Sequence, residues 1–120
     1  MKNFLVFFAL PYLLVTSCNS ENETLTLFSA LRPSETNIYF QNKLTEGPNT
    51  NVLLYEYFYN GAGVALADFN GDQLLDIYFT SNMEENKMYL NRGDFKFEDI
   101  SKISKTQGRS GPWKTGVTAI

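Results

Sequence analysis

The sequence contains no histidine and a single cysteine, Cys18. Without histidine the chain lacks the usual general base of serine hydrolases and a frequent zinc ligand, and one cysteine forms no disulfide within the chain. Basic residues are also few: the 10 Lys and Arg are outnumbered by 13 Asp and Glu and form no cluster. Because phosphate binding needs a basic stripe, we expect no nucleic-acid partner. A length of 120 residues suits one ordinary domain.

Long apolar runs are absent except near the N-terminus. Lys2 precedes an apolar stretch, residues 4–15, which is too short to span a bilayer and has the pattern of a secretory signal. Its ending, VTSC, resembles the bacterial lipobox, in which the chain is cut before the cysteine and the cysteine carries the lipid. We therefore predict a lipoprotein signal peptide at residues 1–17 and lipidation of Cys18. The alternative is a plain cleaved signal followed by an incidental cysteine.

The next segment, residues 18–26, is polar and acidic and has nothing to bury, so we interpret it as a tether. Glu21 and Glu23 weakly resemble the surface-export signal of Bacteroidetes lipoproteins. The expected location is the bacterial outer membrane, through the lipid anchor, with the cell surface as a further possibility. We assign residues 27–120 to the folded part.

Short apolar runs begin at Leu27. They comprise residues 27–31, 37–40 and 52–59, and each has the length of a strand. The aromatic enrichment of the last run favours a strand, although a buried helical turn is an alternative there.

The most informative motif is DFNGDQLLD, residues 68–76. It places side-chain oxygens at loop positions 1, 3, 5 and 9, and calcium prefers six to eight oxygen ligands. The predicted ligands are Asp68, Asn70, Asp72, Asp76 and the backbone carbonyl of Leu74. The alternative is a polar turn that joins two strands without an ion.

The flanks of this motif differ from those of an EF-hand. An EF-hand has helices on both sides and a bidentate Glu at position 12, which is Phe79 here. The flanking residues 63–67 and 76–82 are short and apolar and bounded by Gly and Asn, which indicates strands. A calcium ion would therefore fasten a corner between two strands.

Two more strands are expected after the motif. Residues 87–91 lead through the turn 92–94 into residues 95–100, where Phe95, Phe97 and Asp99 should share one face. The result is an all-β, four-stranded antiparallel meander, which is the unit of a β-propeller blade. Residues 116–120 (GVTAI) match 63–67 (GVALA) and predict that the next repeat begins there, so we interpret the chain as the N-terminal part of a longer propeller.

Residues 59–82 and 87–101, with Trp113 before the second GV, resemble the FG-GAP/VCBS repeats of the cartilage acidic protein type. These repeats occur in many Bacteroidetes lipoproteins and often continue into an ASPIC/UnbV domain. The resemblance spans roughly residues 28–120 and implies a β-propeller with structural calcium held by Asp68, Asn70, Asp72, Asp76 and Leu74.

The chain departs from this family at loop position 6, where the family has Gly and this sequence has Gln73. A left-handed conformation at a residue other than Gly costs about 1 kcal/mol, which would weaken ion binding.

Two other features have simple structural interpretations. Arg92-Gly93-Asp94 matches an integrin-binding tripeptide, but a hairpin turn alone explains it. Trp113 is more typical of a core residue than of a ligand-stacking one.

The predicted function is therefore a lipid-anchored cell-envelope protein that binds a glycan or a protein for adhesion or nutrient uptake. We expect no enzymatic activity, because the acidic residues outside the loop form no spare catalytic pair. The alternative is an extracellular propeller-fold hydrolase or lyase with catalytic residues further along the chain.

Overall fold

The structure is a computed structural model that describes residues 26–120. The predicted signal peptide, the lipidation site Cys18 and most of the tether lie outside the described residues. The elements in chain order are α1 (Pro33–Thr36), β1 (Val64–Ala67), β2 (Asp76–Phe79), β3 (Lys87–Asn91), β4 (Phe97–Asp99) and α2 (Ser101–Ser104). Neither helix of this part is long and apolar enough to cross a membrane.

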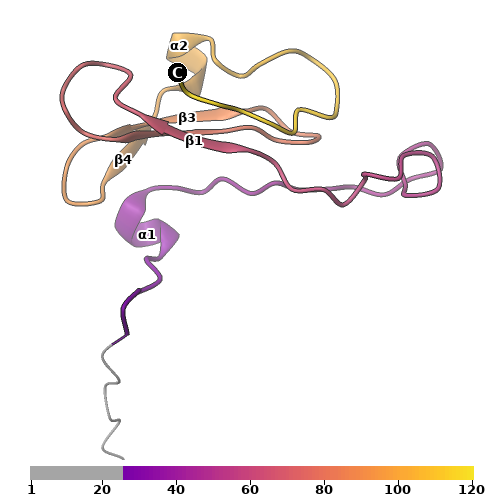
Figure 1. The fold of residues 1–120 in the computed structure, drawn as a ribbon, viewed down its shortest axis with the longest axis horizontal. Helices are drawn as coiled ribbons and strands as arrows, with labels where there is room; N and C mark the ends of the chain where they lie inside the picture. Colours follow the sequence, from indigo (N-terminus) through magenta and orange to yellow (C-terminus); the bar gives the residue numbers. More distant parts are fainter. Residues whose placement is uncertain (1–25) are drawn as a thin grey trace, which may run out of the picture.

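The four strands form one antiparallel sheet in the order β1-β2-β3-β4, which confirms the predicted all-β meander (Figure 1). In the register of this sheet, Leu66 lies opposite Ile77, Ile77 opposite Tyr89, and Tyr89 opposite Asp99. Because side chains alternate along a strand, the sheet has two faces of distinct composition. We name them after two neighbouring residues of β3, the Tyr89 face and the Met88 face.

Strand β4 is shorter than predicted. It begins at Phe97, whereas Asp94 and Phe95 have left-handed backbone conformations with φ of 49° and 55°. Phe95 therefore belongs to the hairpin turn and is exposed, so the prediction that it shares a face with Phe97 and Asp99 is wrong. A left-handed residue reverses the chain and cannot continue the alternation of an extended strand.

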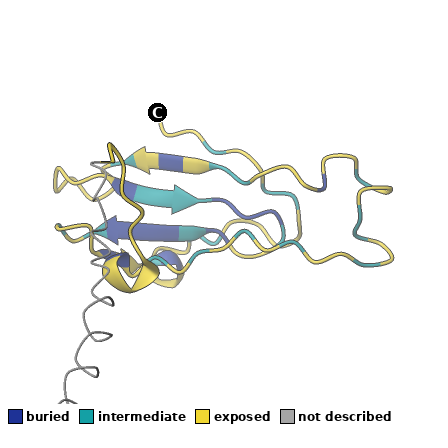
Figure 2. Cartoon of the chain, turned by 90° about the horizontal axis from the view of Figure 1, so that it is seen from below, coloured by how far each residue is buried: buried dark blue, intermediate teal, exposed yellow. Residues whose placement is uncertain are grey.

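Strand β3 is the centre of the core, since three of its five residues are buried (Figure 2). On the Tyr89 face, the ring of Phe40 stacks on Phe79 with centroids 4.6 Å apart. On the Met88 face, the Tyr78 hydroxyl donates a hydrogen bond at 2.7 Å to the carbonyl of Thr106, in the segment that follows α2. The sheet thus lies between the N-terminal segment on one side and α2 with the C-terminal segment on the other (Figure 1).

The N-terminal segment, residues 26–60, contains no strand, so the strand favoured at 52–59 is wrong and the strand-length runs 27–31 and 37–40 are not strands. Around 52–59 the backbone forms successive turns instead, in which the N–H groups of Leu54 and Tyr55 donate to the Asn51 carbonyl. The Asn51 side-chain oxygen also accepts from Leu53 at 3.0 Å. These local bonds satisfy the backbone and compete with strand pairing.

Residues 116–120, where the next repeat is predicted to begin, form no strand. Residues 117–119 instead help to line a small cavity over the Met88 face, together with Ala65 and Tyr78. The backbone there also passes so close to Gly63 that a Cβ at this glycine would lie 2.8 Å from the Val117 nitrogen. The segment therefore covers the sheet rather than extending it.

Candidate metal centre

The acidic loop connects β1 to β2, and its two ends are held together because Ala67 and Asp76 are paired in the sheet. Two of its residues have left-handed backbone conformations, Gly71 with φ of 81° and Gln73 with φ of 70°. The left-handed conformation considered for Gln73 is therefore confirmed. It places backbone strain at loop position 6, where the resemblance implies glycine.

Asp68 organises the first half of the loop. One carboxylate oxygen, Oδ1, accepts hydrogen bonds from the N–H groups of Gly71 at 2.7 Å and Asp72 at 3.1 Å, and Oδ2 accepts from Gln73 at 2.8 Å. The Gln73 N–H, helped by those of Gly71 and Asp72, lowers the pKa of the Asp68 carboxyl below its usual 3.8. The loop is thus wound around an ionised carboxylate.

Asn70 and Asp72 lie together on the outer side of the loop. The Asn70 amide donates to Asp72 Oδ2 at 2.8 Å, and Asn70 Oδ1 accepts from the Asp72 N–H at 3.0 Å. Asp72 Oδ1 accepts from the Leu74 N–H at 2.8 Å. Asp68, Asn70 and Asp72 are exposed and are brought into one short segment by these contacts.

Asp76 occupies a different environment, since it is fully buried at the start of β2. Its Oδ2 accepts from the Phe69 N–H at 2.9 Å and its Oδ1 from the Asn91 N–H at 2.8 Å. Asp76 therefore ties the loop to the end of β3. The sequence pattern identified Asp76 as a candidate ligand but gave no sign of this structural role.

The carboxylate, amide and carbonyl oxygen atoms of the loop are the ligand types that a hard cation prefers. Each carboxylate has about four acceptor positions, so the hydrogen bonds leave free positions on Asp68, Asp72 and Asp76. The Leu74 carbonyl accepts no backbone hydrogen bond from the described residues.

The arrangement of the carboxylates is less favourable. In residues 26–120 no three His, Cys, Asp or Glu side chains converge closely enough to form a metal-ligand group. The donor chemistry fits calcium, and ligation by Asp68, Asn70, Asp72, Leu74 and Asp76 stays a prediction.

The β3–β4 turn contains the Arg-Gly-Asp tripeptide at the same end of the sheet as the acidic loop. The Arg92 guanidinium donates to Glu98 Oε2 at 2.6 and 2.8 Å, and Gly93 has a φ of 83°. The tripeptide thus has the geometry of a hairpin turn whose arginine is already paired across the hairpin.

Trp113 belongs to an aromatic cluster at the opposite end of the sheet. Its ring lies 4.3 Å from that of Tyr55 and 5.4 Å from that of the fully buried Phe58. These contacts agree with the interpretation of Trp113 as a packing residue.

Residues 68–120 match the family model of the FG-GAP-like repeat. Neither a curated protein nor a solved structure matches the chain. The match begins at Asp68, the first residue of the acidic loop, and covers β2, β3 and β4. The chain is therefore similar, from the acidic loop onward, to an FG-GAP-like repeat, and its four-stranded meander is consistent with a propeller blade.

Proposed function

We propose that the protein is a lipid-anchored cell-envelope protein with calcium-stabilised FG-GAP/VCBS propeller repeats of the cartilage acidic protein type. In this proposal the propeller binds a glycan or a protein ligand and serves adhesion or nutrient uptake. The observation that carries the proposal is the acidic corner at 68–76, where an FG-GAP-like match coincides with a loop wound around Asp68.

The proposed calcium ion is structural. Asp68, Asn70, Asp72 and Asp76, with the Leu74 carbonyl, would supply most of its ligands and leave little room for a substrate. The ion would supply positive charge to a segment that carries three carboxylates within nine residues. Calcium binding would in this way hold β1 and β2 in register at the loop end of the sheet.

The proposed anchor is the lipidated Cys18. A diacylated cysteine that is also N-acylated carries several chains, and each buried methylene contributes about 0.8 kcal/mol, so the attachment is stable. This anchor would place the ligand-binding propeller at the outer membrane, including its outer surface.

Two measurements on the full chain in a bacterial host test this proposal. Metabolic labelling with a fatty acid, followed by membrane fractionation, should show labelled protein in the outer membrane for the wild type and loss of the label in Cys18→Ser. A soluble pool of unlabelled wild-type protein would contradict the anchor.

Ligand binding is tested separately. The purified protein is applied to arrays of glycans and of envelope proteins with calcium and then with EDTA. We expect specific binding that falls on chelation because the propeller loses its calcium. Absence of binding to both arrays in calcium would contradict the proposed function.

A further inference from the structure

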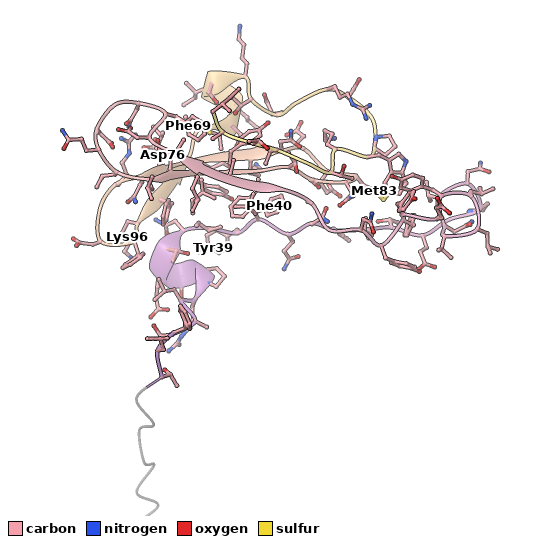
Figure 3. The ribbon with its side chains drawn as sticks, viewed as in Figure 1. Tyr39, Phe40, Phe69, Asp76, Met83 and Lys96 are labelled. Carbon is pink, nitrogen blue, oxygen red and sulfur yellow. The ribbon has the colours of Figure 1, made fainter. Side chains whose placement is uncertain are left out.

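The chain contains two asparagine-glycine pairs, Asn60-Gly61 and Asn70-Gly71. Such pairs are among the sequences most prone to deamidation, because glycine has no side chain to shield its backbone nitrogen or to restrict its rotation. The first pair precedes β1 and the second follows it. Figure 3 shows Phe69 at the acidic-loop end of the sheet and Met83 at the opposite end, where β1 begins. The two pairs therefore lie in different surroundings.

Deamidation of such a pair is a reaction of the chain with itself and with water. The glycine nitrogen loses its proton and attacks the asparagine Cγ, which forms an N–Cγ bond. The Cγ–Nδ2 bond breaks, ammonia leaves with the proton, and a succinimide ring remains. One water molecule then adds to either ring carbonyl and gives aspartate or isoaspartate. The reaction therefore requires a free glycine N–H and an asparagine amide that can turn toward it.

In the acidic loop both reacting groups are already bonded to other atoms. The Gly71 N–H donates to Asp68 Oδ1 at 2.7 Å. The Asn70 amide donates to Asp72 Oδ2 at 2.8 Å, and Asn70 Oδ1 accepts from the Asp72 N–H at 3.0 Å. The Asp68 carboxylate also disfavours the negatively charged nitrogen that the attack requires, because like charges repel. This pair is protected by contacts within its own loop.

The reacting groups of Asn60-Gly61 have no such contacts. Within residues 26–120 the Gly61 N–H and the Asn60 side chain make no hydrogen bond, and only the Asn60 backbone N–H is held, by the Tyr57 carbonyl at 3.0 Å. Both residues are exposed, and a Cβ at Gly61 would meet no atom within 4 Å. The pair lies in the loop before β1 and not on a face of the sheet. Its backbone is free to rotate into the geometry of attack.

We propose that Asn60 is a site of spontaneous deamidation in the folded protein and that the hydrogen bonds of the acidic loop protect Asn70 from the same reaction. The modifying reagent is water, and the product carries a new carboxylate at position 60. This inference goes beyond the proposed function and does not rest on it, because the contrast arises from the two loops themselves.

The sheet remains folded when Asn60 reacts. The Gly63 N–H donates to Thr80 Oγ1 at 2.7 Å, and the Thr80 N–H donates to the Gly63 carbonyl at 2.9 Å. These bonds fix the start of β1 after the reactive pair, whereas isoaspartate lengthens the backbone by a methylene before it. The modification therefore adds negative charge beside Tyr59 without opening the strand pairing.

The test incubates the full chain at neutral and at mildly alkaline pH, in calcium and in EDTA, and follows each pair by peptide mass spectrometry. Isoaspartyl methyltransferase then detects isoaspartate in the peptides. In the folded chain Asn60 should convert at least about tenfold faster than Asn70, because a hydrogen bond to a charged group slows the reaction of its donor by about this factor. Conversion of Asn60 should be faster at the higher pH, because the attacking nitrogen must lose its proton. In urea the two pairs should convert at similar rates.

Variants assign the reaction to the two pairs. Asn60→Gln should abolish the conversion at position 60, and Gly61→Ala should slow it, because the methyl group hinders the nitrogen and restricts its rotation. Gly116→Ala is the matched control, since a Cβ there also meets no atom within 4 Å, and it should leave the rate unchanged. Asp68→Ala in EDTA should speed the conversion of Asn70 by about tenfold and leave that of Asn60 unchanged.

Three results would overturn the inference. Asn60 could stay unmodified in the folded chain while it reacts in urea, or Asn60 and Asn70 could convert equally fast in the folded chain. A contrast of the same size in urea would also overturn it, because the neighbouring side chains and not the fold would then be responsible. Failure of calcium or ligand binding would contradict the proposed function and leave these rates unaffected, so the two proposals fail separately.

Discussion

The sheet with its acidic loop and the N-terminal segment contain similar short apolar runs but use them differently. In residues 64–99 the runs pair with one another, and Met88, Tyr89 and Leu90 are buried. In residues 26–60 the runs make turns, and Leu53 is 91% exposed while Phe58 is fully buried. In this protein an apolar run therefore forms a strand only where a turn brings it beside another strand. In the N-terminal segment, single apolar side chains are buried one at a time instead.

The largest expected effect is a loss of stability of the sheet, the first of the two regions compared. Asp76→Ala removes the fully buried carboxylate that accepts the N–H groups of Phe69 and Asn91 and leaves these two part-buried donors without their partner. We expect the free energy of unfolding to fall by about 4 kcal/mol, measured by urea unfolding of the full chain.

Asp94→Asn is the matched control for this change, because Asp94 is an exposed acid of the β3–β4 turn and asparagine tolerates its left-handed backbone. It should alter the free energy of unfolding by less than about 0.5 kcal/mol. Equal effects of the two changes would refute the structural role of Asp76.

The next largest effect tests whether the N-terminal segment is held by single contacts. Phe58→Ala removes a fully buried ring from the cluster with Trp113 and Tyr59. We expect a loss of about 3 kcal/mol and a changed fluorescence of Trp113, the one tryptophan of the chain. Leu53→Ser in the same segment should change stability by less than about 0.5 kcal/mol because Leu53 is exposed.

A smaller effect sharpens the description of the acidic loop. Gln73→Gly relieves the left-handed conformation at φ of 70° and should stabilise the protein by up to about 1 kcal/mol. The same change should tighten calcium binding in a calorimetric titration. A loss of stability would mean that the Gln73 side chain contributes contacts that outweigh the backbone strain.

The smallest effect is a dependence on pH that resides in the loop. The folded-state pKa of Asp68 is lowered by the N–H groups of Gln73, Gly71 and Asp72, so its contribution to stability is present above the ordinary pKa of 3.8. That contribution is lost as the pH falls from 3.8 through the lowered value. Urea unfolding across this range should show a shallower acid loss for Asp68→Asn than for the wild type, and parallel curves would contradict the assignment.

The sheet could be predicted because its determinants are local. A short apolar run in 87–91, a turn at Gly93 and the acidic loop with Gly71 each specify backbone geometry within a few residues of themselves. The left-handed conformation of Gln73 was expected from its place at loop position 6, where a calcium loop turns sharply.

Other features depend on contacts between distant residues and left no local pattern. Asn42 and Asn82 bond across 40 positions, and single asparagines of this kind are typical of ordinary loops. The pairing even leaves the Asn82 Nδ2 buried without an acceptor among the described residues. The second role of Asp76 was hidden likewise, because it depends on Asn91 of another strand.

The central claim is that the corner at 68–76 binds calcium and thereby stabilises the sheet. Thermal unfolding of the full chain in calcium and in EDTA tests it most directly, with Asp72→Asn as the variant and Asp94→Asn as the control. We predict that calcium at about a hundredfold excess over Kd stabilises the wild type and Asp94→Asn by about 2.7 kcal/mol and that Asp72→Asn loses most of this gain. An identical melting temperature of the wild type in calcium and in EDTA would contradict the claim, as would a full calcium response in Asp72→Asn.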